Sequence, residues 1–325
     1  MACHFPTPAL HDPTAGTITL WPPVGTANEQ LPCGSCLGCK SDRALEWSRR
    51  AQHEASAWTH NTFLTLTYEE EHCPHELLPQ HLQTFIKRLR QRHHRRDPAL
   101  LADLGQLRYL GCGEYGDQNK RPHYHICLFN CGFSDSYRVA KDLSESPTVA
   151  SLWKYGSHKI GTLTGASANY VAQYTLKKVG DKAYCNADGV VLQAPFMRAS
   201  LRPIIGANWI KKYYRDVRNG FLVYDDATPG RIPRSYMLYL EKHYPQIAEE
   251  AKHASDTLRE QKHKQRRANG ADAYPPLRGG AQPTAGLTTE SRKAHQQQQD
   301  EQARLLANGE TIRRTQVNSK RRTAE

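Results

Sequence analysis

Apolar and polar side chains alternate over the segment TFLTLTY, residues 62–68. Alternation among β-branched and aromatic residues is typical of a strand, because successive side chains point to opposite faces of a sheet. One face is expected to carry Phe63 and Thr65. The other face is expected to carry Leu64 and Leu66.

The apolar spacing changes to three and four residues after Pro79. Proline is favoured in the first turn of a helix, and this spacing places apolar side chains on one helical face. The pattern therefore predicts a helix that begins at Pro79 and buries Leu82, Phe85, Ile86 and Leu89. Its remaining positions are strongly cationic, with Lys87, Arg88, Arg90, Arg92 and Arg95.

Two further strands are predicted over residues 107–112 and 123–129, joined by the turn-rich segment GEYGDQNKRP. Ser41 and Asp42 are expected to cap a helix over residues 43–58, with Leu45, Trp47, Ala51 and Ala55 as a broken apolar stripe. Other helical patterns cover residues 149–154 and 168–179, and a strand pattern covers 160–163. This order predicts an α+β domain with a central, at least partly antiparallel sheet flanked by helices.

The composition changes towards the end of the chain. Residues 251–325 contain 15 Lys and Arg against 8 Asp and Glu, which is +7 of the total charge of +12. Gly, Pro, Gln and charged residues dominate there, as is typical of disordered segments. The sequence thus predicts a Cys-rich segment with the first helix over residues 1–60, a folded domain over 61–250 and a disordered basic tail over 251–325. The tail is interpreted either as an arm that contacts DNA phosphates or as a solubilising extension.

The net charge of +12 favours a polyanionic partner such as nucleic acid. No stretch approaches the about 18 apolar residues of a membrane span, and the start MACHFPTPAL lacks the features of a signal peptide. We therefore expect no membrane partner and a location in the cytoplasm. Because thiols stay reduced there, the nine cysteines indicate metal ligation, catalysis or buried thiols rather than disulfides.

His123 and His125 lie two residues apart in a predicted strand, so both imidazoles are expected on one face and Tyr124 on the other. Glu114 lies nine residues before His123, on the partner strand of the hairpin, where its carboxylate can face the same space. Two imidazoles and one carboxylate leave coordination positions of a metal open, as catalysis requires. The alternative interpretation is a pair of exposed strand histidines.

Tyr170 and Tyr174 are four residues apart in a predicted helix and are followed by Lys177 and Lys178. At 3.6 residues per turn these four side chains share one helical face. A phenol is a poor nucleophile at its usual pKa of about 10, but neighbouring lysines favour the phenolate. The two tyrosines are therefore candidate nucleophiles, and the alternative is that their rings pack against the sheet.

Three cysteines share two CxxC steps in the segment PCGSCLGC, namely Cys33, Cys36 and Cys39. Cys3 or His4 can complete four ligands for a structural Zn²⁺. The alternatives are three free thiols in a tight glycine-containing loop, or an iron–sulfur site, whose usual fourth cysteine is missing because KSDR follows.

The segments FLTLT, RPHYH and YVAQYTLKK resemble, in this order, the three motifs of rolling-circle replication initiators of the HUH endonuclease class. The flanking segments PCGSCLGCKSDRALEWSRRAQHEA, CGEYG and LRPIIGANW are similar to those of replication initiation proteins of gokushovirus-type microviruses, which are small single-stranded DNA phages. The resemblance covers roughly residues 30 to 245 and leaves the tail outside.

This resemblance implies a nicking and joining domain over residues 61–250. It implies Mg²⁺ or Mn²⁺ at His123 and His125, with Glu114 as third ligand, and it places Thr65 and Thr67 beside the site as scaffold. Tyr170 and Tyr174 would be the nucleophiles, and Lys177 or Lys178 would contact the phosphate or tune the tyrosines.

The implied activity is cleavage of single-stranded phage origin DNA through a 5′-phosphotyrosine, with a host DNA polymerase and a host helicase as partners. A plasmid replication initiator or relaxase of the same chemistry is the alternative among enzymes. A non-catalytic, zinc-containing DNA-binding protein, with structural histidines, is the alternative outside enzymes.

Overall fold

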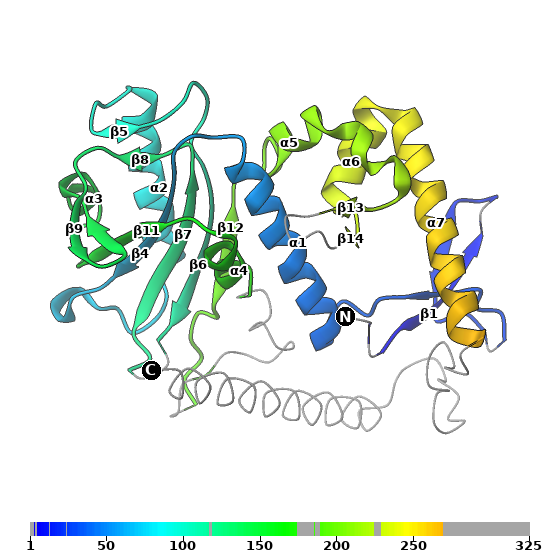
Figure 1. Ribbon diagram of the computed structural model, residues 1–325. Coiled ribbons are helices and arrows are strands. Elements are labelled where there is room, and N and C mark those ends of the chain that lie inside the picture. The colour runs from blue at the N-terminus through cyan, green and yellow to red at the C-terminus, as the bar shows by residue number, and fades with distance from the viewer. Residues whose placement is uncertain are drawn as a thin grey trace, which may run out of the picture. The chain divides into compact units, whose positions relative to one another are not determined.

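The computed structural model describes residues 3, 5–12, 14–23, 25–116, 119–173, 185, 189–223 and 229–268 (Figure 1). These residues form two compact units, one up to Lys40 and one from Ser41 onward. The predicted domain boundaries at residues 60 and 250 stay predictions.

The first unit contains a small antiparallel sheet of order β2-β1-β3. Its strands are β1 (Thr7–Asp12), β2 (Thr17–Leu20) and β3 (Glu29–Leu31). All four residues of β2 are exposed, and the described apolar side chains that are buried in this unit are Ala9, Cys36 and Cys39. The unit therefore has very little hydrophobic core of its own.

The second unit is built on a seven-stranded sheet in which every paired strand is antiparallel, so the predicted antiparallel sheet is confirmed. The hairpin of β6 and β7 lies near its centre, with β4 on the far side of β7. In spatial order the strands are β12 (Phe196–Ala199), β6 (Arg108–Tyr115), β7 (Pro122–Phe129), β4 (Asn61–Thr67), β11 (His158–Thr162), β10 (Leu143–Glu145) and β9 (Tyr137–Ala140).

Helices α2 (Pro79–His94) and α3 (Pro147–Leu152) cover one face of this sheet (Figure 1). The core on this face includes Leu64 and Leu66 of β4, as the alternation predicted. The predicted start of α2 at Pro79 and its buried face are also confirmed, since its buried residues are Leu82, Phe85, Ile86 and Leu89.

Helices α1 (Leu37–Ala55) and α4 (Gly165–Gln173) lie on the opposite face (Figure 1). The predicted start of the first helix is wrong, because α1 begins at Leu37 and Ser41 and Asp42 lie inside it. The predicted apolar stripe also fails in part, since Leu45 is 43% exposed. Instead, α1 buries Ala44, Ser48 and Ala51, whose small side chains allow the helix to approach its neighbours closely.

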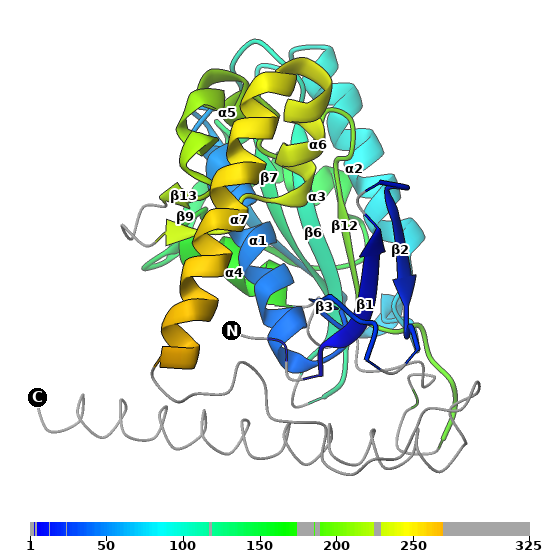
Figure 2. The ribbon, with the colours of Figure 1, turned by 90° about the vertical axis from the view of Figure 1, so that its right-hand side faces the viewer.

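A third cluster of buried residues is formed by helices in the C-terminal half of the second unit. Its elements are α5 (Ala207–Lys212), the 3-10 helix η2 (Tyr214–Asn219), α6 (Arg234–His243) and α7 (Pro245–Ala268). Figures 1 and 2 show α6 and α7 side by side. Because α7 continues to Ala268 and buries Ala251, residues 251–268 are helical and not disordered as predicted. Residues 269–325 lie outside the described residues.

Short elements complete the second unit. They are η1 (Glu70–His72), the strand pair β5 (Leu100–Leu101) and β8 (Gly132–Phe133), and the strand pair β13 (Leu222–Val223) and β14 (Pro229–Gly230).

His53 of α1 is a buried titratable group in the contact with the C-terminal helices. Its ring stacks on Trp209 at 3.7 Å between centroids, and its Nδ1 lies 3.0 Å from the Tyr236 hydroxyl. Burial, assisted by the charge of Arg49, lowers the pKa of His53 to about 4. The unfolded chain, in which the pKa of histidine is about 6.5, therefore binds this proton more tightly than the folded chain.

The contribution of His53 to stability is complete above pH 6.5 and is lost as the pH falls towards 4. We expect it to lower the free energy of unfolding by about 2 kcal/mol between pH 7 and pH 5. Urea unfolding at both pH values measures this loss in the wild type and in His53→Gln. The variant should lose less stability over the same interval, and an equal loss in both proteins would contradict the prediction.

Candidate functional site

The three central strands of the large sheet bring the predicted metal ligands together. Glu114 of β6 lies directly opposite His123 of β7, so the two side chains share one face of the sheet. His125 follows two residues later on the same face, and its neighbour on β4 is Thr65. The convergence predicted from the hairpin is therefore present, on the face that carries α1 and α4.

One carboxylate oxygen lies at the centre of this group. Glu114 Oε1 is 2.9 Å from His123 Nε2 and 3.0 Å from His125 Nε2. The Glu114 side chain is 4% exposed, while those of His123 and His125 are 18% and 11% exposed. The histidines are thus not simply exposed strand residues, and the alternative interpretation of this pair is excluded.

Both imidazole rings are held through their other nitrogen atom. His123 Nδ1 lies 3.1 Å from the carbonyl oxygen of Arg121, and His125 Nδ1 lies 3.0 Å from Thr65 Oγ1. The His125 ring also stacks on Phe63 at 5.8 Å. Sequence reasoning placed Thr65 beside the site but missed Phe63 and Arg121, because a main-chain carbonyl leaves no signal in the sequence.

These anchors decide which atoms face the carboxylate. A carbonyl oxygen only accepts hydrogen bonds, so the contact with Arg121 places a proton on His123 Nδ1. The neutral ring then turns the lone pair of Nε2 towards Glu114. Acceptors that face each other at such short distances are stabilised by a cation or by protonation of the imidazoles.

The donor set fits a divalent cation. One ligand atom from each of Glu114, His123 and His125 lies within 4.8 Å of the others. Imidazole and carboxylate ligands with ordered partners behind them are typical of metal sites that keep coordination positions open. This group could therefore hold a metal ion.

Tyr170 of α4 reaches the same carboxylate from above the sheet. Its phenol donates a hydrogen bond of 2.8 Å to Glu114 Oε1. The ring is 41% exposed and lies edge-on to His125, with 5.0 Å between centroids. The phenol oxygen is thus at the candidate metal centre, and the ring is accessible from outside rather than buried against the sheet.

The other residues predicted for this site fall where the structure makes no description. Tyr174, Lys177 and Lys178 lie outside the described residues, because α4 is described only to Gln173. Their proposed roles stay predictions.

The predicted cysteine cluster assembles in the first unit. Cys3, Cys33, Cys36 and Cys39 place their sulfur atoms within 4.8 Å of one another, and this group could also hold a metal. Cys3 thus occupies the fourth position, and His4 lies outside the described residues. Burial opposes ionisation of Cys33, but the amide groups of Cys36 and Ser35 lower the pKa of this thiol to about 6.

Comparison with known proteins adds a family to this geometry. The family model described as a replication-associated protein of the ORF2 type matches residues 61–179, a range that includes Glu114, His123, His125 and Tyr170. No solved structure matches the chain. Among the described residues, no helix is long and apolar enough to cross a membrane.

Three phage proteins are similar to the chain. Replication-associated protein VP4 of Bdellovibrio phage phiMH2K is 33% identical over 227 residues, which cover 68% of this chain and 70% of VP4. Replication-associated protein ORF2 of Spiroplasma virus 4 is 41% identical over 169 residues, covering 48% of this chain and 51% of ORF2. Replication-associated protein ORF4 of Chlamydia phage 1 is 27% identical over 213 residues, covering 59% of this chain and 50% of ORF4.

Proposed function

Because the chain belongs to the ORF2-type family of replication-associated proteins, we propose that it starts phage rolling-circle replication by nicking and rejoining single-stranded DNA. It is a phage replication-associated protein of the microvirus type. The proposed substrate is the single-stranded origin of the phage genome. Its proposed chemistry is that of an HUH endonuclease, with a 5′-phosphotyrosine intermediate.

A single observation carries this proposal: a phenol and two imidazoles converge on one carboxylate oxygen. The Tyr170 hydroxyl is 2.8 Å from Glu114 Oε1, and both histidine Nε2 atoms lie within 3.0 Å of the same atom. A potential nucleophile therefore adjoins a potential metal centre, as attack on a metal-bound phosphate requires.

His123, His125 and Glu114 would hold the cation, for which we propose Mg²⁺ or Mn²⁺. When bound, such an ion would polarise the scissile phosphate and neutralise charge that develops in the transition state. The two Nδ1 anchors, at Arg121 and Thr65, fix the imidazoles in the orientation that this role needs.

The proposed step exchanges one phosphoester bond for another. The Tyr170 oxygen attacks the phosphorus, the bond from phosphorus to O3′ breaks, and a 5′-phosphotyrosine and a free 3′-hydroxyl result. Glu114 accepts the phenol hydrogen bond and is placed to take its proton, while the leaving O3′ gains a proton from solvent. Because the phosphoester bond energy is kept, joining by the reverse reaction needs no ATP, and the sequence contains no GxxxxGK[ST] loop.

Completion of the cycle involves residues and partners beyond the described site. We propose that Tyr174 cleaves the regenerated origin after one round, and that the released 3′-hydroxyl then attacks the first phosphotyrosine to close a circle. Lys177 or Lys178 would contact the phosphate or favour the phenolate. A host DNA polymerase would extend the 3′ end, and a host helicase would unwind the duplex.

The test uses the full chain and single-stranded oligonucleotides that tile the genome encoding it, with Mn²⁺ and with EDTA. In a denaturing gel, one oligonucleotide should form a covalent protein adduct that EDTA prevents. A 5′-phosphotyrosine predicts that a label at the 3′ end of the DNA moves with the protein, while a label at the 5′ end stays on the free fragment. Adduct with the 5′-labelled fragment would contradict the proposed polarity.

The same gel separates the alternative functions. A non-catalytic DNA-binding protein would shift DNA in a native gel but leave no adduct under denaturing conditions. The reported relatives are all phage proteins, which favours a phage origin over that of a plasmid initiator or relaxase.

A further inference from the structure

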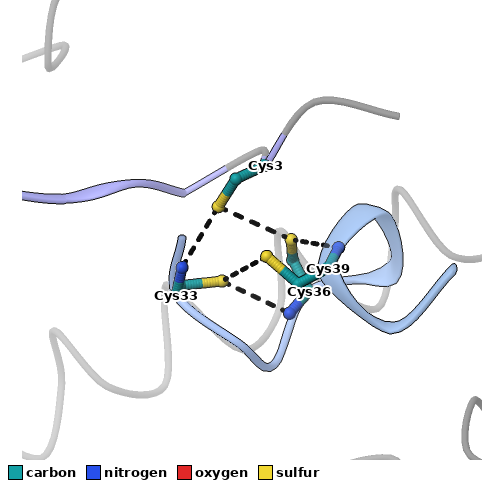
Figure 3. A group of neighbouring side chains, drawn as sticks. All are labelled: Cys3, Cys33, Cys36 and Cys39. Carbon is teal, nitrogen blue, oxygen red and sulfur yellow. Dashed lines mark hydrogen bonds between the residues drawn. The ribbon is translucent and has the colours of Figure 1, made fainter. Parts of the chain in front are cut away.

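Four cysteines from two separate segments meet in the first unit (Figure 3). Cys3 comes from the segment before β1, and Cys33 and Cys36 come from the turn after β3. Cys39 lies in the first turn of α1. Residues 30 positions apart in sequence are therefore in contact, since the Cys33 amide donates a hydrogen bond to the Cys3 sulfur.

The sulfur atoms have the spacing of ligands around one tetrahedral ion. Cys33 Sγ and Cys39 Sγ are 4.0 Å apart, and Cys36 Sγ and Cys3 Sγ are 3.8 Å apart. Four sulfurs at about 2.3 Å from a tetrahedral zinc lie about 3.8 Å from one another. The observed separations exceed the about 2.05 Å of a disulfide bond, and all four cysteines are free.

Main-chain amides surround the sulfurs in the way that thiolate ligands need. Cys36 N–H donates to Cys33 Sγ at 3.3 Å, and Cys39 N–H donates to Cys36 Sγ at 3.5 Å. These bonds follow from the CxxC spacing, which folds the chain back over each sulfur as it enters α1. They stabilise negative charge on sulfur and fix its direction, the role that outer partners play in metal sites.

The unit has a physical need for such a crosslink. None of the three described clusters of buried hydrophobic residues includes a residue from positions 3–40. β2 is exposed along its whole length, and Ile18, Leu20 and Trp21 are each more than half exposed. A small sheet with so little apolar burial is typically stabilised by a metal or by disulfides.

We propose that Cys3, Cys33, Cys36 and Cys39 bind one structural Zn²⁺ that ties the N-terminal segment to the β3–α1 turn. Four thiolates fill a tetrahedral shell and leave no position for substrate, so this ion stabilises the fold and takes no part in the cleavage reaction. The site is distinct from the Glu114 group, which offers three ligands of nitrogen and oxygen.

Metal analysis of the untagged full chain is the direct test. We expect about one zinc per chain, retained after dialysis against a weak chelator, with an X-ray absorption spectrum of sulfur ligands at about 2.3 Å. The double variant His123→Ala/His125→Ala should keep this zinc, because its ligands are elsewhere. Absence of metal from the wild type, an iron-containing brown protein, or zinc that is lost in the histidine variant would each overturn the proposal.

Cysteine variants locate the ion. Cys33→Ser and Cys36→Ser should lose the zinc, whereas Cys73→Ser, a partly buried cysteine outside the group, should keep it. Should the cluster variants fail to fold, removal of zinc from the wild type with a strong chelator gives the same information. Proteolysis should then cut within residues 3–40 and spare the second unit, and readdition of Zn²⁺ should restore protection. Unchanged cleavage in the presence and absence of zinc would contradict a structural role.

Discussion

Loss of either histidine of the candidate centre is expected to abolish the metal-dependent adduct with DNA. His123→Ala and His125→Ala each remove one of three ligands and leave Glu114 with a single imidazole neighbour. Changes to residues behind metal ligands already cost about 10 to 100-fold in affinity or activity. We therefore expect the rate of adduct formation to fall by more than about 100-fold, measured in single-turnover reactions on denaturing gels.

A matched control separates this effect from general damage. His72→Ala changes an exposed histidine of η1 and should cleave like the wild type. All three variants should bind the oligonucleotide in EDTA with similar affinity, because the cation is not needed for contact with the DNA backbone. Cleavage at the wild-type rate by both histidine variants would show that the imidazoles are structural and would contradict the nickase proposal.

The second large effect is expected at the nucleophile. Tyr170→Phe keeps the ring beside His125 but removes the hydroxyl that reaches Glu114. If Tyr174 is a second nucleophile, the single variants Tyr170→Phe and Tyr174→Phe should each retain some cleavage but fail to complete the cycle. The double variant should form no adduct, since removal of a nucleophile can cost about 10⁶-fold in rate.

Peptide mapping of the adduct shows which tyrosine carries the DNA. We expect a nucleotide-modified peptide that contains Tyr170 in the wild type, and none at the exposed control position Tyr213. Production of closed circles by a Tyr170→Phe or Tyr174→Phe variant at the wild-type yield would show that only one tyrosine is used.

Several elements could be predicted because their cause is local. The alternation in β4 and the three–four spacing in α2 follow from how side chains project from strands and helices, and both assignments agree with the structure. The hairpin between β6 and β7 was predictable from its turn residues, and with it the pairing of Glu114 and His123. Helix α1 was misplaced because its first turn grows out of the cysteine turn, which carries no usual capping signal.

The sequence by itself determined the periodicities, the ligand types, the candidate nucleophile and the cysteine spacing, since these depend on residues close together in the chain. Only the tertiary structure decided which atoms meet. Tyr170 is 56 residues from Glu114, and Cys3 is 33 residues from Cys36, yet both pairs are in contact. Such contacts arise from packing of α4 on the sheet and from return of the N-terminal segment to the β3–α1 turn. Local spacing cannot specify them, because they depend on the summed burial and hydrogen bonding of each compact unit.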